Sequence, residues 1–189
     1  MSGRMLKYLI ATLLFLGNMA HSEANDNIRT VKEYYKAFNK KDYWKLGMLV
    51  SDRIVIVEME SKVVDSKDSF LSVVKWGEVL RSKNIIKSIT QEGGKVVVIE
   101  KQKSDRIKFI YGKEVIARSS YTVESGQIVK IEVELLDFDR ERLKDRNGPF
   151  MHWVKMNYPS KMQAMRKVDR EGAVSFKEAM KLYRKRKPE

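Results

Sequence analysis

The chain has 189 residues, no cysteine and a formal net charge of +13, from 38 lysine and arginine residues against 25 aspartate and glutamate residues. The lack of cysteine excludes disulfide bonds, thiolate catalysis, thiolate metal sites and lipid attachment at a cysteine. The length is sufficient for one domain with a substantial hydrophobic core. The basic excess is concentrated in residues 151–189, which hold 11 lysine and arginine residues against 4 acidic residues.

Residues 1–24 have the pattern of a cleavable secretory signal. Arg4 and Lys7 precede an apolar run over residues 8–17, and small residues surround a cleavage position near Ala24. The run is about half of the ~20 residues needed to cross a bilayer. We therefore expect a mature chain that begins near Asn25 and is exported, either periplasmic or secreted. An uncleaved N-terminal membrane anchor is the alternative.

Helices and a strand are predicted after the signal. Apolar residues at helical spacing indicate a helix over residues 28–39, and a second short helix is expected over residues 43–50 with Asp42 as its N-cap. β-Branched residues predict a strand over residues 53–59. Ser66 then precedes a third helical pattern that extends to Leu80.

The chain next changes to alternating apolar and polar residues, which is the pattern of strands with one buried face. Extended segments are predicted over residues 84–91, 95–103, 106–124 and 128–136. A three-residue loop over 125–127 would place Val123 opposite Val129 and Arg118 opposite Glu134. Helices followed by a long antiparallel meander favour an α+β fold.

The basic C-terminal extension contains further helical patterns. One begins at Pro159, and Ser175 with Glu178 forms a capping box for a second helix. The apolar stripe of this second helix is Phe176, Ala179, Met180 and Tyr183. We expect the stripe to dock on the domain, and contact of residues 175–187 with an anionic membrane surface is the alternative. The terminal basic residues lack interleaved aromatic residues, which argues against a nucleic-acid partner.

The order of helix, helix, strand, helix and long hairpin strands resembles the nuclear transport factor 2-like superfamily, including its SnoaL-like branch. The most similar stretches are residues 33–57 and 120–129. The resemblance implies an α+β domain over residues 25–150, in which a curved antiparallel sheet forms a cone around the N-terminal helices. Residues 151–189 would then form a basic helical extension. Such a cone hosts isomerases, dehydratases, cyclases and proteins without chemistry, so the fold alone does not define a function.

Two residues are candidate catalytic residues through this resemblance. Ketosteroid isomerases of the superfamily combine a carboxylate base with a tyrosine and a protonated aspartic acid. Aligned on Asp42, the tyrosine falls on Tyr34, the base falls on Glu58, and the third position falls near Arg118, which is not an acid. The alternative roles are a core position for Tyr34, a solvated position for Glu58 and a cross-strand pair between Arg118 and Glu134.

We expect, as the first hypothesis, that the domain binds a small apolar ligand or a protein partner without catalysis. A proton-transfer enzyme that uses Glu58 and Tyr34 is the second hypothesis, and the resemblance also implies a homodimer through the sheet face. No cofactor or metal is expected, because His152 is the single histidine after residue 24 and no phosphate-binding glycine loop is present. The candidate ligand-pocket residues are Tyr35, Phe38, Trp44, Trp76 and Tyr121.

Overall fold

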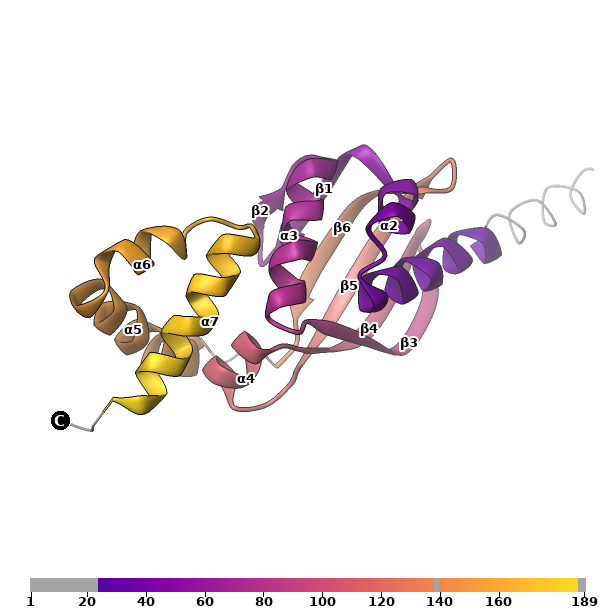
Figure 1. Cartoon of the computed structure of the whole chain (residues 1–189). Helices are drawn as coiled ribbons and strands as arrows, with labels where there is room; N and C mark the ends of the chain where they lie inside the picture. The colour runs from indigo at the N-terminus through magenta and orange to yellow at the C-terminus, as the bar shows by residue number, and fades with distance from the viewer. Residues whose placement is uncertain (1–23, 138–139, 187–189) are drawn as a thin grey trace, which may run out of the picture.

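The structure is a computed structural model that describes residues 24–137 and 140–186. The predicted signal segment, apart from residue 24, lies outside the described residues. A curved sheet faces the first helices of the chain, and the C-terminal helices follow at one end of the sheet (Figure 1). This arrangement confirms the predicted α+β cone.

The elements follow one another in this order: a helix over residues 24–40, α2 (Tyr43–Leu49), β1 (Val50–Glu58), β2 (Ser61–Val64), α3 (Lys67–Val79), β3 (Lys83–Glu92), β4 (Lys95–Lys103), α4 (Asp105–Tyr111), β5 (Val115–Glu124), β6 (Gln127–Leu135), α5 (Arg140–Asn157), α6 (Pro159–Ala164) and α7 (Arg170–Lys185). No helix among the described residues is both long enough and apolar enough to cross a membrane.

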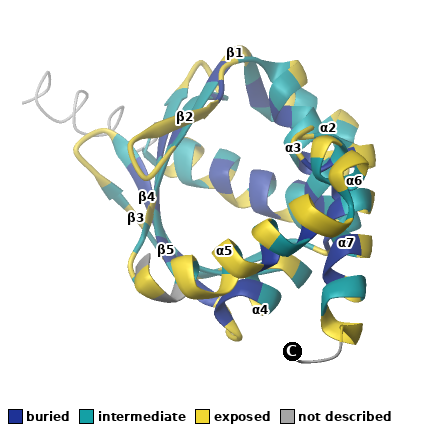
Figure 2. Cartoon of the chain, turned by 90° about the vertical axis from the view of Figure 1, so that its left-hand side faces the viewer, coloured by how far each residue is buried: buried dark blue, intermediate teal, exposed yellow. Residues whose placement is uncertain are grey.

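The six strands form one sheet in the order β2-β1-β6-β5-β4-β3. Neighbouring strands are antiparallel except for β1 and β6, which pair in parallel. The main core lies between this sheet and the first three helices, where Val31, Leu46, Phe70 and Val98 are almost fully buried. Figure 2 shows the sheet and the helices on opposite sides of this core, with α4 and α5 at one end.

The prediction of one continuous strand over residues 106–124 was wrong, because α4 precedes β5. The Ser104 side chain accepts a hydrogen bond from the backbone N–H of Ile107 at 3.0 Å, which caps the start of α4. Gly112 adopts a left-handed conformation with φ of 71° and ends the helix. The segment between these caps contains isoleucine, phenylalanine and tyrosine, which are common in strands. Its composition therefore led to the wrong prediction of a strand.

The hairpin between β5 and β6 has a two-residue turn instead of the predicted three-residue loop. Ser125 and Gly126 have φ of 49° and 77°, the backbone of the tight turns that suit hairpin twist. Val123 pairs with Ile128, and a bulge then restores the register so that Arg118 lies opposite Glu134, as predicted. Ile128, and not Val129, is consequently the buried residue at this end of the sheet.

The C-terminal helices form a second core against α3. Phe150 on α5 and Phe176 on α7 are buried there, with ring centroids 5.5 Å apart. The apolar stripe of α7 therefore docks on the domain, as expected. The helix begins at Arg170, five residues before the predicted capping box, because the Asp169 side chain accepts a hydrogen bond from the N–H of Gly172 at 2.8 Å.

Candidate functional site

A pocket of about 460 Å³ lies at the mouth of the cone. Strand β2 and the ends of β1, β4, β5 and β6 contribute to its walls, together with α3, α4 and α5. Most of the walls are apolar, and the polar groups Glu58, Gln102 and Arg106 stand among them. The principal apolar lining residues are Met59, Val63, Trp76, Ile110, Leu135 and Leu143. We refer to this hollow as the cone pocket.

Glu58 reaches the cone pocket because β1 ends there. It pairs with Val133 of β6 in the parallel ladder, and the N–H of Met59 donates to the Val133 carbonyl oxygen at 3.1 Å. Met59 and Glu60 have positive φ values of 49° and 67°, so the chain turns sharply into β2. This turn holds the exposed Glu58 side chain at the rim of the pocket.

Arg106 is the cationic group of the cone pocket. It lies on α4, and its guanidinium carbon is 5.7 Å from the centroid of the Trp76 ring. This distance is typical of a cation–π interaction, which holds the Arg106 charge beside the apolar wall of the pocket. The pocket therefore offers one anionic and one cationic side chain to a bound molecule.

A buried polar network continues from the cone pocket into the core. The Gln102 amide nitrogen, from the pocket wall, donates to Glu100 Oε1 at 3.0 Å, and the Ser119 hydroxyl donates to the same oxygen at 2.7 Å. Glu100 is only 1% exposed. Its other oxygen, Oε2, makes no hydrogen bond of acceptable geometry within the described part of the chain. Burial raises the pKa of the Glu100 carboxyl, and the hydrogen bonds from Ser119 and Gln102 offset part of that rise.

Two tyrosine hydroxyls extend this network. Tyr121 donates a hydrogen bond to the Tyr35 hydroxyl at 2.8 Å, and both side chains are buried. Burial raises the pKa of both phenols, and the nearby charge of Glu100 raises it further. Both tyrosines are therefore neutral at neutral pH. Sequence reasoning identified these tyrosines but missed Glu100, although period-two alternation from Val96 places Glu100 on the same inward face of β4.

The other predicted residues divide among three places. Tyr34 and Phe38 lie with Tyr35 and Tyr121 in the main core, where the Tyr34 ring is 5.8 Å from each of the other two tyrosine rings and 6.1 Å from Phe38. Trp76 lines the cone pocket and also packs against the second core. Trp44 is 74% exposed on α2.

The structure does not bring the two candidate catalytic residues into one pocket wall. Glu58 lines the cone pocket, whereas Tyr34 does not, and Tyr34 is 6% exposed in the core. Burial raises the pKa of the Tyr34 phenol, and the charge of Glu100 adds to that effect. The tyrosine that does line the pocket is Tyr111, which is 8% exposed.

Arg118 lies outside the cone pocket and outside the buried polar network of Glu100. It is opposite Glu134 in the strand register, but the predicted ion pair between these two residues does not form; its guanidinium Nη2 is instead 2.7 Å from Glu92 Oε2. The long side chain reaches across β4 to the end of β3 on the outer face of the sheet. No group of three or more histidine, aspartate or glutamate side chains that could hold a metal ion occurs within residues 24–137 and 140–186.

Comparison with solved structures supports the fold. A protein called Bal32a, from a soil-derived mobile gene cassette, is 17% identical, with a TM-score of 0.53 over 61% of this chain and 92% of its own. A candidate ketosteroid isomerase from Kribbella flavida is 7% identical, with a TM-score of 0.53 over 62% of this chain and 83% of its own. A candidate polyketide cyclase from Sinorhizobium meliloti is 18% identical, with a TM-score of 0.50 over 56% of this chain and 94% of its own. No protein-family model and no curated protein matches the sequence significantly.

Proposed function

Since the chain has the cone fold of the nuclear transport factor 2-like and SnoaL-like proteins, we propose that it binds a small, mainly apolar molecule in the cone pocket without catalysis. The observation that carries the proposal is the pocket itself. Its volume of about 460 Å³ suits a small organic ligand, and its walls are mainly apolar with a few polar groups. Glu58 and Arg106 would orient polar groups of the ligand, and Trp76 and Leu135 would contact its apolar part.

A ligand screen tests this proposal. Apolar and amphipathic compounds that enter the cone pocket are expected to raise the melting temperature of the full chain, because a ligand that binds only the folded state stabilises it. Leu135→Trp should remove this shift by filling the pocket. Leu136→Trp is the matched control, since Leu136 is 50% exposed and does not line the pocket.

Each variant is compared with its own ligand-free melting temperature, so a change in basal stability does not mimic loss of binding. At a ligand concentration of about 100 times the dissociation constant, the wild-type protein and the control should gain roughly 5 °C or more. A ligand shift that survives in Leu135→Trp would show that the compounds bind elsewhere. The absence of any shift across the library would count against the ligand-binding function.

Proton-transfer catalysis is the second candidate function. The likeness to candidate isomerase and cyclase structures agrees with it in fold, and the position of Glu58 in an apolar pocket with Tyr111 favours it. A carboxylate base requires a substrate carbon acid within reach and a donor for the developing oxyanion. In this version of the hypothesis, Tyr34 serves as core packing and Tyr111 contacts the substrate.

The measurement for this second function is the isomerisation of a β,γ-unsaturated ketosteroid, followed by ultraviolet absorbance. Glu58→Gln should lower the rate by at least about 100-fold, which is the usual contribution of a positioned base. Glu60→Gln, in the exposed turn after β1, is the control with the same change of charge. A wild-type protein without measurable turnover would remove this candidate.

We also propose that the protein is exported and that its partners bind outside the cone pocket. The signal pattern over residues 1–24 supports export, and mass spectrometry of the protein recovered from the periplasm or medium should find an N-terminus near Asn25. Proposed partners are a second copy of the chain at the sheet face and an anionic surface at residues 175–187. Because the apolar stripe of α7 is buried, such a surface would contact the polar side of that helix.

A further inference from the structure

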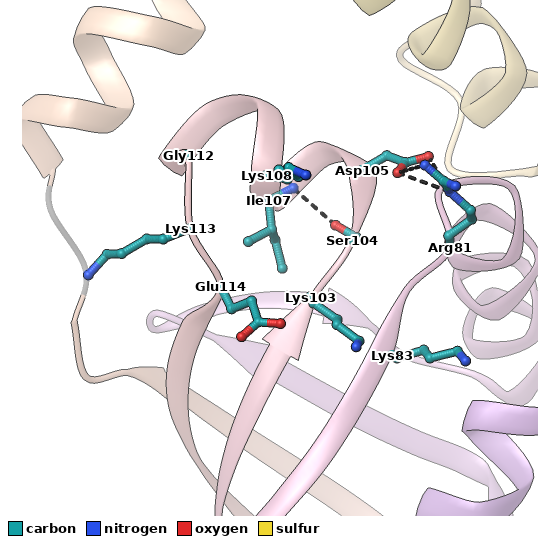
Figure 3. A pocket seen from close by; sticks show the side chains of 10 residues that line it. All are labelled: Arg81, Lys83, Lys103, Ser104, Asp105, Ile107, Lys108, Gly112, Lys113 and Glu114. Atoms are coloured by element: carbon teal, nitrogen blue, oxygen red, sulfur yellow. Dashed lines mark hydrogen bonds and ion pairs between the residues drawn. The ribbon is translucent and has the colours of Figure 1, made fainter.

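A second pocket, of about 490 Å³, lies between the ends of β3 and β4, helix α4 and the segment that follows α4 (Figure 3). It shares only Ser104 and Ile107 with the cone pocket. Five of its ten lining residues are lysine or arginine, and two are aspartate or glutamate. We refer to it as the basic pocket. Its positive side chains are Arg81, Lys83, Lys103, Lys108 and Lys113.

Both carboxylates of the basic pocket already have cationic partners. Asp105 accepts hydrogen bonds from Arg81 Nε at 2.9 and 3.0 Å, and its Oδ2 is 3.7 Å from Lys177 Nζ. Glu114 Oε2 is 2.7 Å from Lys101 Nζ, outside the pocket lining. The charge of Lys103 also helps to lower the pKa of the Glu114 carboxyl, so Glu114 offsets part of the positive charge of the pocket.

Three lysines are left without an ion pair within the described part of the chain: Lys83, Lys103 and Lys108. Lys83 and Lys103 are directly opposite each other in the antiparallel ladder of β3 and β4. Like charges in that position destabilise a sheet. The third lysine comes from α4, so lysines of three different elements line one pocket (Figure 3).

We propose that the basic pocket binds a small soluble ligand that carries a phosphate group with two or more negative charges, held by Lys83, Lys103 and Lys108. Lysine ammonium groups bind phosphate oxygens as compact point charges. An anion placed among the three side chains would relieve the repulsion between Lys83 and Lys103. The volume of the pocket exceeds that of a phosphate group, so the rest of the ligand would lie beside Ile107. This site does not depend on the function of the cone pocket.

Isothermal titration calorimetry of the full chain with pyrophosphate at low ionic strength tests the proposal. The double variant Lys83→Gln/Lys103→Gln should bind at least about tenfold more weakly than wild type, because it loses two close charge contacts. Lys62→Gln/Lys75→Gln has the same net charge and changes exposed lysines on β2 and α3. This control should bind like wild type. Binding to the wild-type protein should weaken as sodium chloride is added.

The melting temperature provides a second measurement, which does not depend on the heat of binding that calorimetry records. Without anion, Lys83→Gln/Lys103→Gln should melt slightly above wild type, because the repulsion across the ladder is gone. Pyrophosphate at about 100 times its wild-type dissociation constant should raise the melting temperature of wild type and control by roughly 5 °C or more, and that of the double variant by about half as much or less.

Three results would overturn the proposal. The first is a wild-type protein that does not bind pyrophosphate. The second is equal binding by Lys83→Gln/Lys103→Gln and by Lys62→Gln/Lys75→Gln, which would indicate a general effect of net charge. The third is binding to phosphatidylglycerol vesicles without binding to pyrophosphate, because the site would then recognise a membrane surface and not a small soluble phosphate.

Discussion

Gly172→Ala is expected to lower the free energy of unfolding by about 3 kcal/mol, at the upper end of the usual cost of overpacking. A Cβ atom at Gly172 would lie 1.9 Å from the backbone oxygen of Lys167 and 2.9 Å from its carbonyl carbon. Both are backbone atoms, so no side-chain rotation can relieve the clash. The segment between α6 and α7 would have to shift, and α7 would lose part of its contact with the second core.

Urea denaturation followed by tryptophan fluorescence measures this effect. Gly47→Ala is the matched control, because Gly47 lies inside α2 and a Cβ there meets no atom within 4 Å. Replacing a helical glycine with alanine should instead raise the free energy of unfolding by roughly 0.5–1 kcal/mol. If Gly172→Ala and Gly47→Ala change stability by similar amounts, the close contact with Lys167 does not control the docking of α7.

Glu100→Gln is expected to change how stability depends on pH. Burial raises the pKa of the Glu100 carboxyl in the folded state above its ordinary value of 4.5. The folded protein therefore binds this proton more tightly than the unfolded chain. The stabilising contribution of the carboxyl is complete below pH 4.5 and is lost as pH rises through the folded-state pKa. Above that pKa, the core holds a buried negative charge, which destabilises the fold even though Ser119, Gln102, Tyr35 and Asn84 help to lower the pKa of the carboxyl.

Glutamine has nearly the shape of glutamate and carries no charge, so it should remove this cost. At pH 8 the variant should be more stable than wild type by about 1–3 kcal/mol, the usual penalty of a buried unsatisfied polar group. The difference should vanish near pH 4.5. Glu114→Gln is the control in the exposed segment between α4 and β5, where Lys101 lowers the pKa of the carboxyl.

Urea denaturation at several pH values between 4 and 8 provides the measurement for both variants. Glu114→Gln should show no gain in stability at pH 8, because the charged form of Glu114 is already compensated by Lys101. A Glu100→Gln protein that is less stable than wild type at pH 8 would mean that the ionised carboxylate is well compensated in the core. The hydroxyls of Tyr35 and Tyr121 would then be the groups to test next.

The helices and strands that sequence predicted best are those with strong periodicity. The helix over residues 24–40 was predicted over residues 28–39 from the spacing of its apolar residues. Strand β1 was predicted over residues 53–59 from its β-branched residues. Helix α4 was missed because its composition is strand-like and only its caps, Ser104 and Gly112, distinguish it. Local patterns are therefore reliable where many residues repeat one period, and less so for a seven-residue helix defined by its ends.

The candidate site was only partly accessible to sequence reasoning. Tyr35, Tyr121 and Glu58 were identified, and the alternation along β4 contained enough information to place Glu100 on the inner face. Two features were not accessible. The cone pocket combines residues from eight helices and strands, from Glu58 to Leu143, and the exposure of Trp44 depends on how α2 lies against the sheet.

By itself, the sequence determined the types of most elements, the α+β fold class and the docking of the α7 stripe, because these follow from periodic burial that neighbouring residues share. The cone shape of the sheet was implied by the resemblance to the nuclear transport factor 2-like superfamily. The tertiary structure decided which residues meet. It separated Tyr34 from Glu58, buried Glu100 beside two tyrosines, and placed Lys83 opposite Lys103. The curvature of the sheet and the side-by-side pairing of its strands set these contacts between residues far apart in the chain.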